Sequence, residues 1–194
     1  MDINHYTNQL IEYFSKVEML SLEEQEIIKD GLDIRVFEKG THLFKAGQKT
    51  NDNYFVLKGC VRQYRLEDGE EITINFFTEE QWILSFVNNE KDLAYNLSCC
   101  EECVLVVGND EKGNAMIKEF PKFLDISQKI LQQEIINQQK GFAEFATNSP
   151  EERYQNLQKN NPELIQRVPQ HQLASFLGIK PESLSRIRKR LSNK

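Results

Sequence analysis

The segment 180–191, "KPESLSRIRKRL", carries the side chains best suited to bind a nucleic acid. Leu184, Ile187 and Leu191 recur at the spacing of one helical face. Arginine can bind guanine O6 and N7 bidentately, glutamate can accept from cytosine N4, and lysine can neutralise a phosphate. The opposite face is therefore predicted to contact DNA. Its residues are Glu182, Ser183, Ser185, Arg186, Lys189 and Arg190.

A second short helix is predicted to position this face. Pro169 suits the first turn of a helix, and Pro181 suits the start of the next one. Between them, Gly178 permits a sharp turn and Ile179 can fill the angle between the two helices. The spacing of small residue, turn glycine and apolar plug is typical of a helix-turn-helix. The inward side chains of the first helix are Leu173, Ala174 and Leu177.

Charge separates this ending from the rest of the chain. Residues 168–194 carry six basic side chains and one acidic side chain, which gives +5, so the remainder carries −11 of the total of −6. A basic end on an acidic body is typical of a nucleic-acid-binding module joined to another unit, although a solvated basic tail would have the same charge. Gln170 and His171, at the start of the first helix, and Lys180 at the turn complete the predicted DNA-contacting set.

Composition indicates a soluble protein with room for one ordinary domain and a small one. The chain has 194 residues, of which 39% are hydrophobic and 28% charged. We expect no membrane partner, because no stretch approaches the roughly 18 apolar residues of a membrane helix. The start of the sequence does not resemble a secretion signal, so we expect a cytoplasmic location. The four cysteines are then expected to be reduced thiols: Cys60, Cys99, Cys100 and Cys103.

Residues 33–107 read as short β-type runs separated by glycines. Asp68-Gly69 predicts a two-residue hairpin, because both residues tolerate positive φ angles. After that turn, Ile72, Ile74 and Phe76 should fall on one face of a strand. The pattern favours an antiparallel roll or barrel over a parallel sheet.

A long helix is predicted over 120–147, with a heptad-like apolar seam that two glutamines interrupt, Gln128 and Gln138. Ile126, Ile130 and Ile136 lie off the seam. We expect such a helix to pack both on its own roll and on a partner helix, whereas the alternative is a helix packed on the roll alone. Ser149, Pro150 and Glu152 then predict a new helix and a unit boundary. The predicted dimerisation residues are Leu124, Leu131, Ile135, Phe142 and Phe145.

The order of elements resembles the Crp/Fnr family of bacterial transcription regulators over about residues 20–191. The resemblance is most specific in "SPEERYQNLQKNNPELIQRVPQHQLASFLGIKPESLSRIRKRL" and in "FEKGTHLFKAGQKTNDNYFVLKGCVRQY". It implies an α+β fold in three parts. These are a cyclic-nucleotide-binding-like antiparallel β-roll (a double-stranded β-helix) in residues 1–119, a dimerisation helix in 120–148 and a winged-helix-type helix-turn-helix domain in 149–194.

That resemblance implies a regulator that is not an enzyme. It would bind double-stranded DNA as a homodimer at an inverted-repeat operator, and it would contact RNA polymerase if it is an activator. Recognition helices of the family commonly carry an Arg-Glu pair and a further Arg that read bases. Glu182 and Arg186 match the last two, but the first position holds Pro181, so the operator need not be the family's usual one. Any wing would have to come from the segment before Pro169.

The family's nucleotide pocket is poorly matched. Gln81-Trp82 stands where the phosphate-binding cassette has Gly-Glu, and Leu93-Ala94 stands near its Arg-Ser position. The chain has no arginine between Arg65 and Arg153. An acidic pocket without arginine repels a phosphate, so we expect cyclic AMP binding to be lost and the effector to be a different one, or none. The acids of this region are Glu79, Glu80, Glu90, Asp92, Glu101 and Glu102.

Two other classes of function remain open. A cupin-type enzyme also uses a β-roll, but it needs clustered metal ligands, and the only histidines are His5, His42 and His171. An interaction protein could use the basic end to bind a protein. The run "CCEEC" (99–103) suggests metal or redox chemistry, but Cys99 and Cys103 would share a strand face while Cys100 points away. Buried, inert thiols are the simpler interpretation, and we expect no cofactor and no metal.

Overall fold

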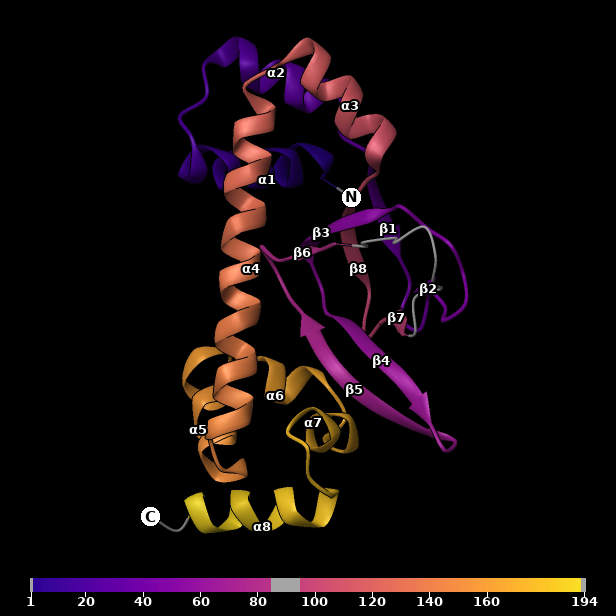
Figure 1. Ribbon diagram of the computed structural model, residues 1–194, viewed down its shortest axis with the longest axis vertical. Coiled ribbons are helices and arrows are strands. Elements are labelled where there is room, and N and C mark those ends of the chain that lie inside the picture. The colour runs from indigo at the N-terminus through magenta and orange to yellow at the C-terminus, as the bar shows by residue number, and fades with distance from the viewer. Residues whose placement is uncertain (1, 85–94, 193–194) are drawn as a thin grey trace.

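The computed structural model describes residues 2–84 and 95–192 (Figure 1). Helices precede, follow and flank a β-roll, and one long helix runs from the top of the molecule to its C-terminal helices. The helices are α1 (Ile3–Val17), α2 (Leu22–Asp30), α3 (Asp110–Glu119), α4 (Phe123–Thr147), α5 (Pro150–Asn160), α6 (Leu164–Arg167), α7 (Gln170–Phe176) and α8 (Pro181–Ser192). The strands are β1 (Ile34–Phe37), β2 (His42–Phe44), β3 (Asn53–Lys58), β4 (Val61–Glu67), β5 (Glu70–Phe77), β6 (Trp82–Ile83), β7 (Asn96–Cys99) and β8 (Cys103–Gly108).

The roll consists of two antiparallel four-stranded sheets, in the orders β1-β8-β3-β6 and β2-β7-β4-β5. The predicted hairpin is confirmed, since Asp68 and Gly69 have φ angles of 51° and 85° between β4 and β5. The predicted strand face after it is wrong. Thr73 and Phe76 are buried while Ile74 is 46% exposed, because the pairing of β4 with β5 shifts register beside Ile74.

The outer face of the first sheet packs against helices. Leu10 and Phe14 of α1 lie with Phe55 of β3 in one apolar cluster, to which α4 contributes Ile126 and Ile130. The prediction that the off-seam isoleucines pack on the same chain is therefore confirmed for Ile126 and Ile130 and wrong for Ile136, which is 44% exposed. Helix α1 itself was not predicted; it begins behind Asp2, whose carboxylate accepts from the backbone N–H of His5.

Helix boundaries follow local capping. Ser149 and Glu152 form a complete capping box at the start of α5, directly after α4 ends at Thr147, as predicted. Helix α3 begins at Asp110, capped by the side chain of Asn109, and runs through Gly113.

The C-terminal helices share a third apolar cluster. It joins Tyr154 and Leu164 to the inward side chains of α7 and α8, and it includes Cys60 and Phe76 of the roll. Residues 148–168, where the sequence left room for a wing, form α5 and α6 instead. None of the helices in the part of the chain that the structure describes is long and apolar enough to cross a membrane.

Candidate nucleic-acid interface

Backbone hydrogen bonds fix the turn between α7 and α8. Gly178 has φ +70°, its N–H donates to Ser175 O at 2.9 Å, and Ile179 N–H donates to Ala174 O at 3.0 Å. This pair of bonds is a Schellman motif, in which the glycine adopts a conformation that a side chain would strain. A Cβ at Gly178 would also lie 3.1 Å from the ring of Phe145 in α4. The angle of α8 is therefore set by its own turn and by the end of the long helix.

The outer face of α8 is exposed as the sequence predicted. Leu184 and Ile187 are buried against α7, and Leu191 is half-buried. Of the predicted contacts on this helix, Ser183 is half-buried and the others are exposed: Glu182, Ser185, Arg186, Lys189 and Arg190. Gln170, His171 and Lys180 are exposed as well. The structure thus brings the predicted DNA-contacting residues onto two adjoining helices and their turn.

One member of this set is already engaged. Arg190 forms an ion pair with Glu151 in the first turn of α5. No ion pair involves Arg186 or Lys189 among the described residues. These two side chains are therefore available to an external anion without breaking an internal bond, and Arg190 is not.

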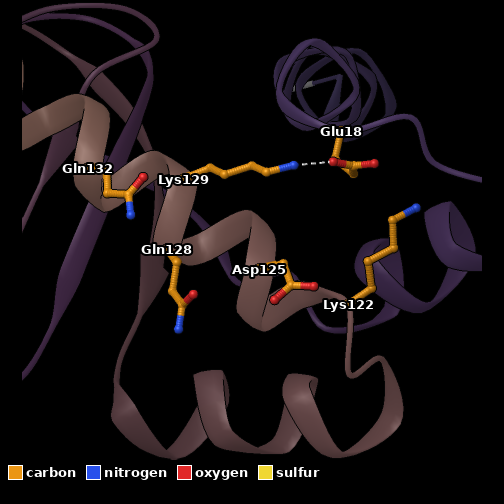
Figure 2. A pocket seen from close by; sticks show the side chains of 6 residues that line it. All are labelled: Glu18, Lys122, Asp125, Gln128, Lys129 and Gln132. Atoms are coloured by element: carbon orange, nitrogen blue, oxygen red, sulfur yellow. Dashed lines mark hydrogen bonds and ion pairs between the residues drawn. The ribbon is translucent and has the colours of Figure 1, made fainter.

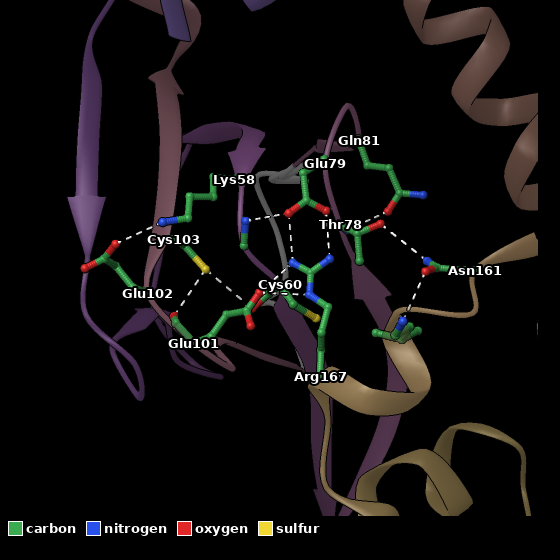
Figure 3. Close-up of polar contacts among 12 residues, drawn as sticks. Lys58, Cys60, Thr78, Glu79, Gln81, Glu101, Glu102, Cys103, Asn161 and Arg167 are labelled. Atoms are coloured by element: carbon green, nitrogen blue, oxygen red, sulfur yellow. Dashed lines mark hydrogen bonds and ion pairs between the residues drawn. The ribbon is translucent and has the colours of Figure 1, made fainter. Parts of the chain in front are cut away.

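An arginine outside the predicted set attaches the C-terminal helices to the roll. Arg167, the last residue of α6, donates to Glu79 Oε1 and Oε2 at 2.8 Å each and to Glu101 Oε1 at 3.0 Å (Figure 3). Burial would raise the pKa of Glu79, but hydrogen bonds from Arg167 and from the Gly59 amide outweigh it and lower that pKa. The sequence did not reveal this site, because its partners lie 66 and 88 residues from Arg167.

Helix α7 also rests on strand β5. The backbone N–H of Thr73 donates to Ser175 Oγ at 2.9 Å, and the rings of Phe76 and Phe176 meet edge to face at 5.4 Å. Asn161 Nδ2 donates to Thr78 Oγ1 at 3.5 Å. Figure 1 shows the β4–β5 hairpin reaching down to α7. Helix α7 thus attaches the helix-turn-helix to the roll through β5, and the outer face of α8 takes no part in these contacts.

The long helix α4 leaves an apolar stripe uncovered. Ile135 is 48% exposed and Phe142 is 77% exposed, while Leu131 is half-buried. Leu124, near the start of the helix, is also exposed. Phe145 has a mixed position, because one face of its ring stacks on the guanidinium of Arg153 at 4.2 Å. The predicted seam is therefore largely open, with its last residue shared with the C-terminal helices.

Gln128, one of the two predicted polar gaps in the seam, lines an open polar pocket of about 530 Å³ beside the end of α1 (Figure 2). Its two lysines are paired, Lys129 with Glu18 and Lys122 with Glu24 at 3.4 Å. Gln138, the other gap, is exposed.

A second pocket, of about 430 Å³, lies between α1–α4 and the outer face of the first sheet. Its lining is mainly apolar and includes Leu10, Phe14 and Met116. At its rim, Lys112 Nζ bonds Asp33 Oδ2 at 2.6 Å, and the pKa of Asp33 is lowered to about 2, chiefly by hydrogen bonds from Arg35 and Lys112. In both pockets the lysines are thus neutralised by carboxylates of the chain itself.

The predicted effector residues that the structure describes have other roles. Gln81 holds the turn before β6, since its Oε1 accepts from Thr78 N–H at 2.7 Å and its carbonyl accepts from Val56 N–H at 3.0 Å. Trp82 faces α1, where its Nε1 donates to the Tyr13 hydroxyl at 3.2 Å. Leu93 and Ala94 lie outside the described residues.

Between the two sheets of the roll, side chains from both pack against each other. The first sheet supplies Tyr54, Val56, Ile83, Cys103, Leu105 and Val107, and the second supplies Phe44, Val61, Leu97 and Cys99. This interior is apolar, so its described part offers a phosphate no cationic partner.

Residues 34–120 match the model of the cyclic nucleotide-binding domain. A comparison with curated proteins finds no match. Among solved structures, the c-di-GMP responsive global regulator CLP of Xanthomonas campestris has a TM-score of 0.66 at 18% identity, over 89% of this chain and 92% of that one. FixK2 of Bradyrhizobium japonicum has a TM-score of 0.65 at 12% identity, over 84% and 85%.

The catabolite activator protein of Thermus thermophilus is similar over 93% of this chain and 87% of that one, with a TM-score of 0.54 at 19% identity. Two of these three proteins are named as a regulator or an activator, and none is named as an enzyme. Identities this low show the fold alone. Residues 34–120 therefore match the cyclic nucleotide-binding domain, and the chain has the fold of the Crp/Fnr-type regulators, as the sequence resemblance predicted.

Proposed function

We propose that this chain is a DNA-binding transcriptional regulator of the Crp/Fnr type and not an enzyme. The observation that carries the proposal is the exposed basic face of α8, set on a turn that backbone hydrogen bonds fix. A helix held in this way can enter the major groove, which is wide enough to admit it. The local charge of +5 favours a polyanion as its partner.

Within this face, the side chains have different roles. Arg186 and Glu182 read base edges, because both are exposed on α8 and have the donors and acceptors that guanine and cytosine require. Lys189 neutralises phosphate, and Arg190 can do so only by releasing Glu151. The remaining residues of the set contact the sugar-phosphate backbone: Gln170, His171, Lys180, Ser183 and Ser185.

The protein acts as a homodimer in this proposal, joined along α4. A single helix-turn-helix reads only a few base pairs, too few to find one site among genomic competitors. Ile135 and Phe142 give the open stripe of α4 the apolar surface that a second copy would cover. Two-fold symmetry makes the operator an inverted repeat, with half-site centres roughly 34 Å apart. The working units are residues 1–119, 120–148 and 149–194.

The roll serves as a regulatory unit that does not bind cyclic AMP. The lysines of the two pockets beside it are paired with carboxylates, and the described part of its interior is apolar. A regulator of this kind works in the bacterial cytoplasm and, if it activates, contacts RNA polymerase.

The test is to sequence the genomic DNA that co-purifies with the protein. We expect enrichment of a small set of sites that share an inverted repeat, and protection of both half-sites in a footprint. Random genomic fragments, without a shared motif, would contradict the proposal and favour an interaction protein. Stoichiometric metal in the same preparation would instead support the cupin-type enzyme.

A further inference from the structure

Two thiols face each other where the roll meets the C-terminal helices. Cys60 lies in the turn between β3 and β4, and Cys100 directly follows β7. The N–H of Cys100 donates to Cys60 O at 2.8 Å, one step beyond the pairing of Val61 with Cys99. Facing residues of antiparallel strands have Cα atoms about 4.5–5.5 Å apart, and disulfides join Cα atoms about 4.4–6.8 Å apart. The backbone therefore already has the spacing of a disulfide.

The other two thiols occupy a different place. Cys99 and Cys103 lie in the interior of the roll, whereas Cys60 and Cys100 pack in the cluster of the C-terminal helices. The prediction that Cys100 points away from the face shared by Cys99 and Cys103 is thus confirmed. Cys100 is half-buried and Cys60 is fully buried. A diffusing oxidant can reach the first of the pair but not the second.

Their surroundings make the two thiols unequal. A hydrogen bond from the Cys60 thiol lowers the pKa of Cys100, and the nearby guanidinium of Arg62 adds to the effect. The same hydrogen bond and burial raise the pKa of Cys60. A reactive cysteine is a partly exposed thiolate near a cation, often next to a resolving thiol. Cys100 has the partial exposure and the nearby cation of a reactive cysteine, and Cys60 lies where a resolving thiol would.

We propose that Cys60 and Cys100 form a reversible oxidation site for hydroperoxides, in which Cys100 is oxidised first and Cys60 resolves it to an intramolecular disulfide. The Cys100 sulfur attacks the outer oxygen of the peroxide, and the O–O bond breaks. One oxygen stays on sulfur as a sulfenic acid, and the other leaves as water or alcohol with the thiol proton. The Cys60 sulfur then displaces the sulfenic hydroxyl, which leaves as water with the second proton. The peroxide gains the two electrons that the thiols lose.

The site is built into the connection between the roll and the C-terminal helices. Gly59, next to Cys60, donates its N–H to Glu79 Oε1 at 2.8 Å, and Glu101 follows Cys100. The carboxylates of Glu79 and Glu101 both form ion pairs with Arg167 (Figure 3). A disulfide holds the two sulfurs about 2.05 Å apart and so cross-links the two turns that position these carboxylates. Oxidation therefore restrains Glu79 and Glu101 relative to each other and changes how Arg167 is held.

The packing between the two turns supports this coupling. Gly59 has φ +104°, and a Cβ there would lie 2.7 Å from Glu102 O and 2.9 Å from Cys103 Cα. The backbones are in such close contact that a shift of one turn displaces the other.

The chemistry is tested on the purified full chain with hydrogen peroxide, followed by intact-mass measurement and a non-reducing peptide map. We expect the loss of two hydrogen atoms' mass, a peptide cross-linked between Cys60 and Cys100, and reversal by dithiothreitol. In Cys60→Ser, dimedone should trap a sulfenic acid on Cys100. Cys99→Ser is the matched control and should still form the disulfide. A bond between Cys99 and Cys103, or oxidation of Cys100 only to sulfinic acid, would overturn the proposal.

The regulatory consequence rests on the proposed function and has its own readout. Coupling between two sites typically amounts to about a 5–150-fold change in affinity. We expect peroxide to change operator affinity by at least about fivefold in the wild type and in Cys99→Ser, but not in Cys60→Ser. A disulfide that forms without changing operator affinity would overturn the coupling and leave the proposed function intact. A reduced protein that binds no operator would contradict the function while the peptide map still decides the chemistry.

Discussion

The outer face of α8 and the surroundings of the roll differ in whether their basic side chains form ion pairs within the chain. On α8, Arg186 and Lys189 are exposed and outside every ion pair among the described residues. Beside the roll, Lys112, Lys122 and Lys129 are each paired with a carboxylate. A cation that is already neutralised attracts a phosphate weakly. One end of the molecule thus carries exposed basic side chains outside ion pairs, whereas the lysines beside the roll form ion pairs within the chain.

The contacts of Arg167 show that acidic residues of the cassette region also form internal ion pairs. The acids that made the cassette region unsuitable for a phosphate in the sequence include Glu79 and Glu101. In the structure these two carboxylates bind the guanidinium from α6 instead. The region is therefore an attachment point for the C-terminal helices. Substitutions in α4, in α8 and at Arg167 test each of these roles separately.

The largest effect is expected from breaking the α4 stripe with Ile135→Glu combined with Phe142→Glu. Both side chains are exposed, so the charges should not unfold the chain, but they would repel a second copy across the interface. We expect a monomer by light scattering. Operator affinity should fall about 10³-fold towards the value for random DNA, because only one half-site can then be bound at a time.

Leu66→Glu is the control for this variant, since Leu66 is an exposed apolar residue of the β4–β5 hairpin. It should remain dimeric and bind the operator normally. A wild type that is monomeric in solution yet protects two symmetric half-sites would contradict the assignment to α4, because pairing would then arise on the DNA.

The next largest effect concerns the reading face of α8. Arg186→Ala should lower discrimination between the operator and a single-base variant by about 1–3 kcal/mol, as expected for a lost bidentate base contact. Lys189→Ala should weaken all duplexes evenly and reduce the salt slope by about one unit. Fluorescence anisotropy at several salt concentrations measures both. If Arg186→Ala weakens operator and random DNA equally, a different residue is the reader.

A smaller effect is expected where the two regions join. Arg167→Ala should lower the free energy of unfolding by about 1–2 kcal/mol, less than the about 3–5 kcal/mol of a fully buried pair, because Glu79 is 38% exposed. The pKa of Glu79 is lowered from 4.5, so its contribution is present above pH 4.5 and is lost as pH falls through the folded-state pKa. Wild type and variant should converge in stability in acid.

Urea unfolding at neutral pH and at decreasing pH below 4.5 measures this convergence. Arg65→Ala removes an exposed pair with Glu67 and is the control. It should change stability by less than about 1 kcal/mol at either pH. A difference for Arg167→Ala that stays constant with pH would show that Arg167 acts by packing instead of by its charge.

Local signals in the sequence were sufficient for much of the fold and for the α8 face. The turn at Gly178, the cap at Ser149, the start of α8 at Pro181 and the hairpin at Asp68-Gly69 depend on neighbouring residues only, and the structure has all of them. The exposed face of α8 followed from helical spacing. Caps, turns and exposed helix faces can be predicted from a sequence because the interacting groups are only a few residues apart.

Features that depend on distant contacts were missed. Nothing near Arg167 indicates Glu79 or Glu101, and nothing near Cys60 indicates Cys100, 40 positions along the chain. The bulge that exposes Ile74 breaks the alternation of β5 without any local marker. Helix α1 had a local signal, Leu10, Ile11 and Phe14 on one face behind an Asp2 cap, which was overlooked.

The smallest effect is expected from cyclic nucleotides. A ligand present at about 100 times its Kd stabilises the folded state by about 2.7 kcal/mol, so binding would raise the melting temperature visibly. We expect millimolar cyclic AMP or cyclic GMP to leave it unchanged. Residues 66–152 contain no arginine, and Trp82 faces α1. An operator duplex in the same assay should raise the melting temperature and shows that the protein is active. Nucleotide stabilisation that Arg167→Ala abolishes would mean that a phosphate competes with Glu79 and Glu101 for that guanidinium. The region beside the roll would then have kept its ability to bind a nucleotide, and its ion pairs would regulate that binding.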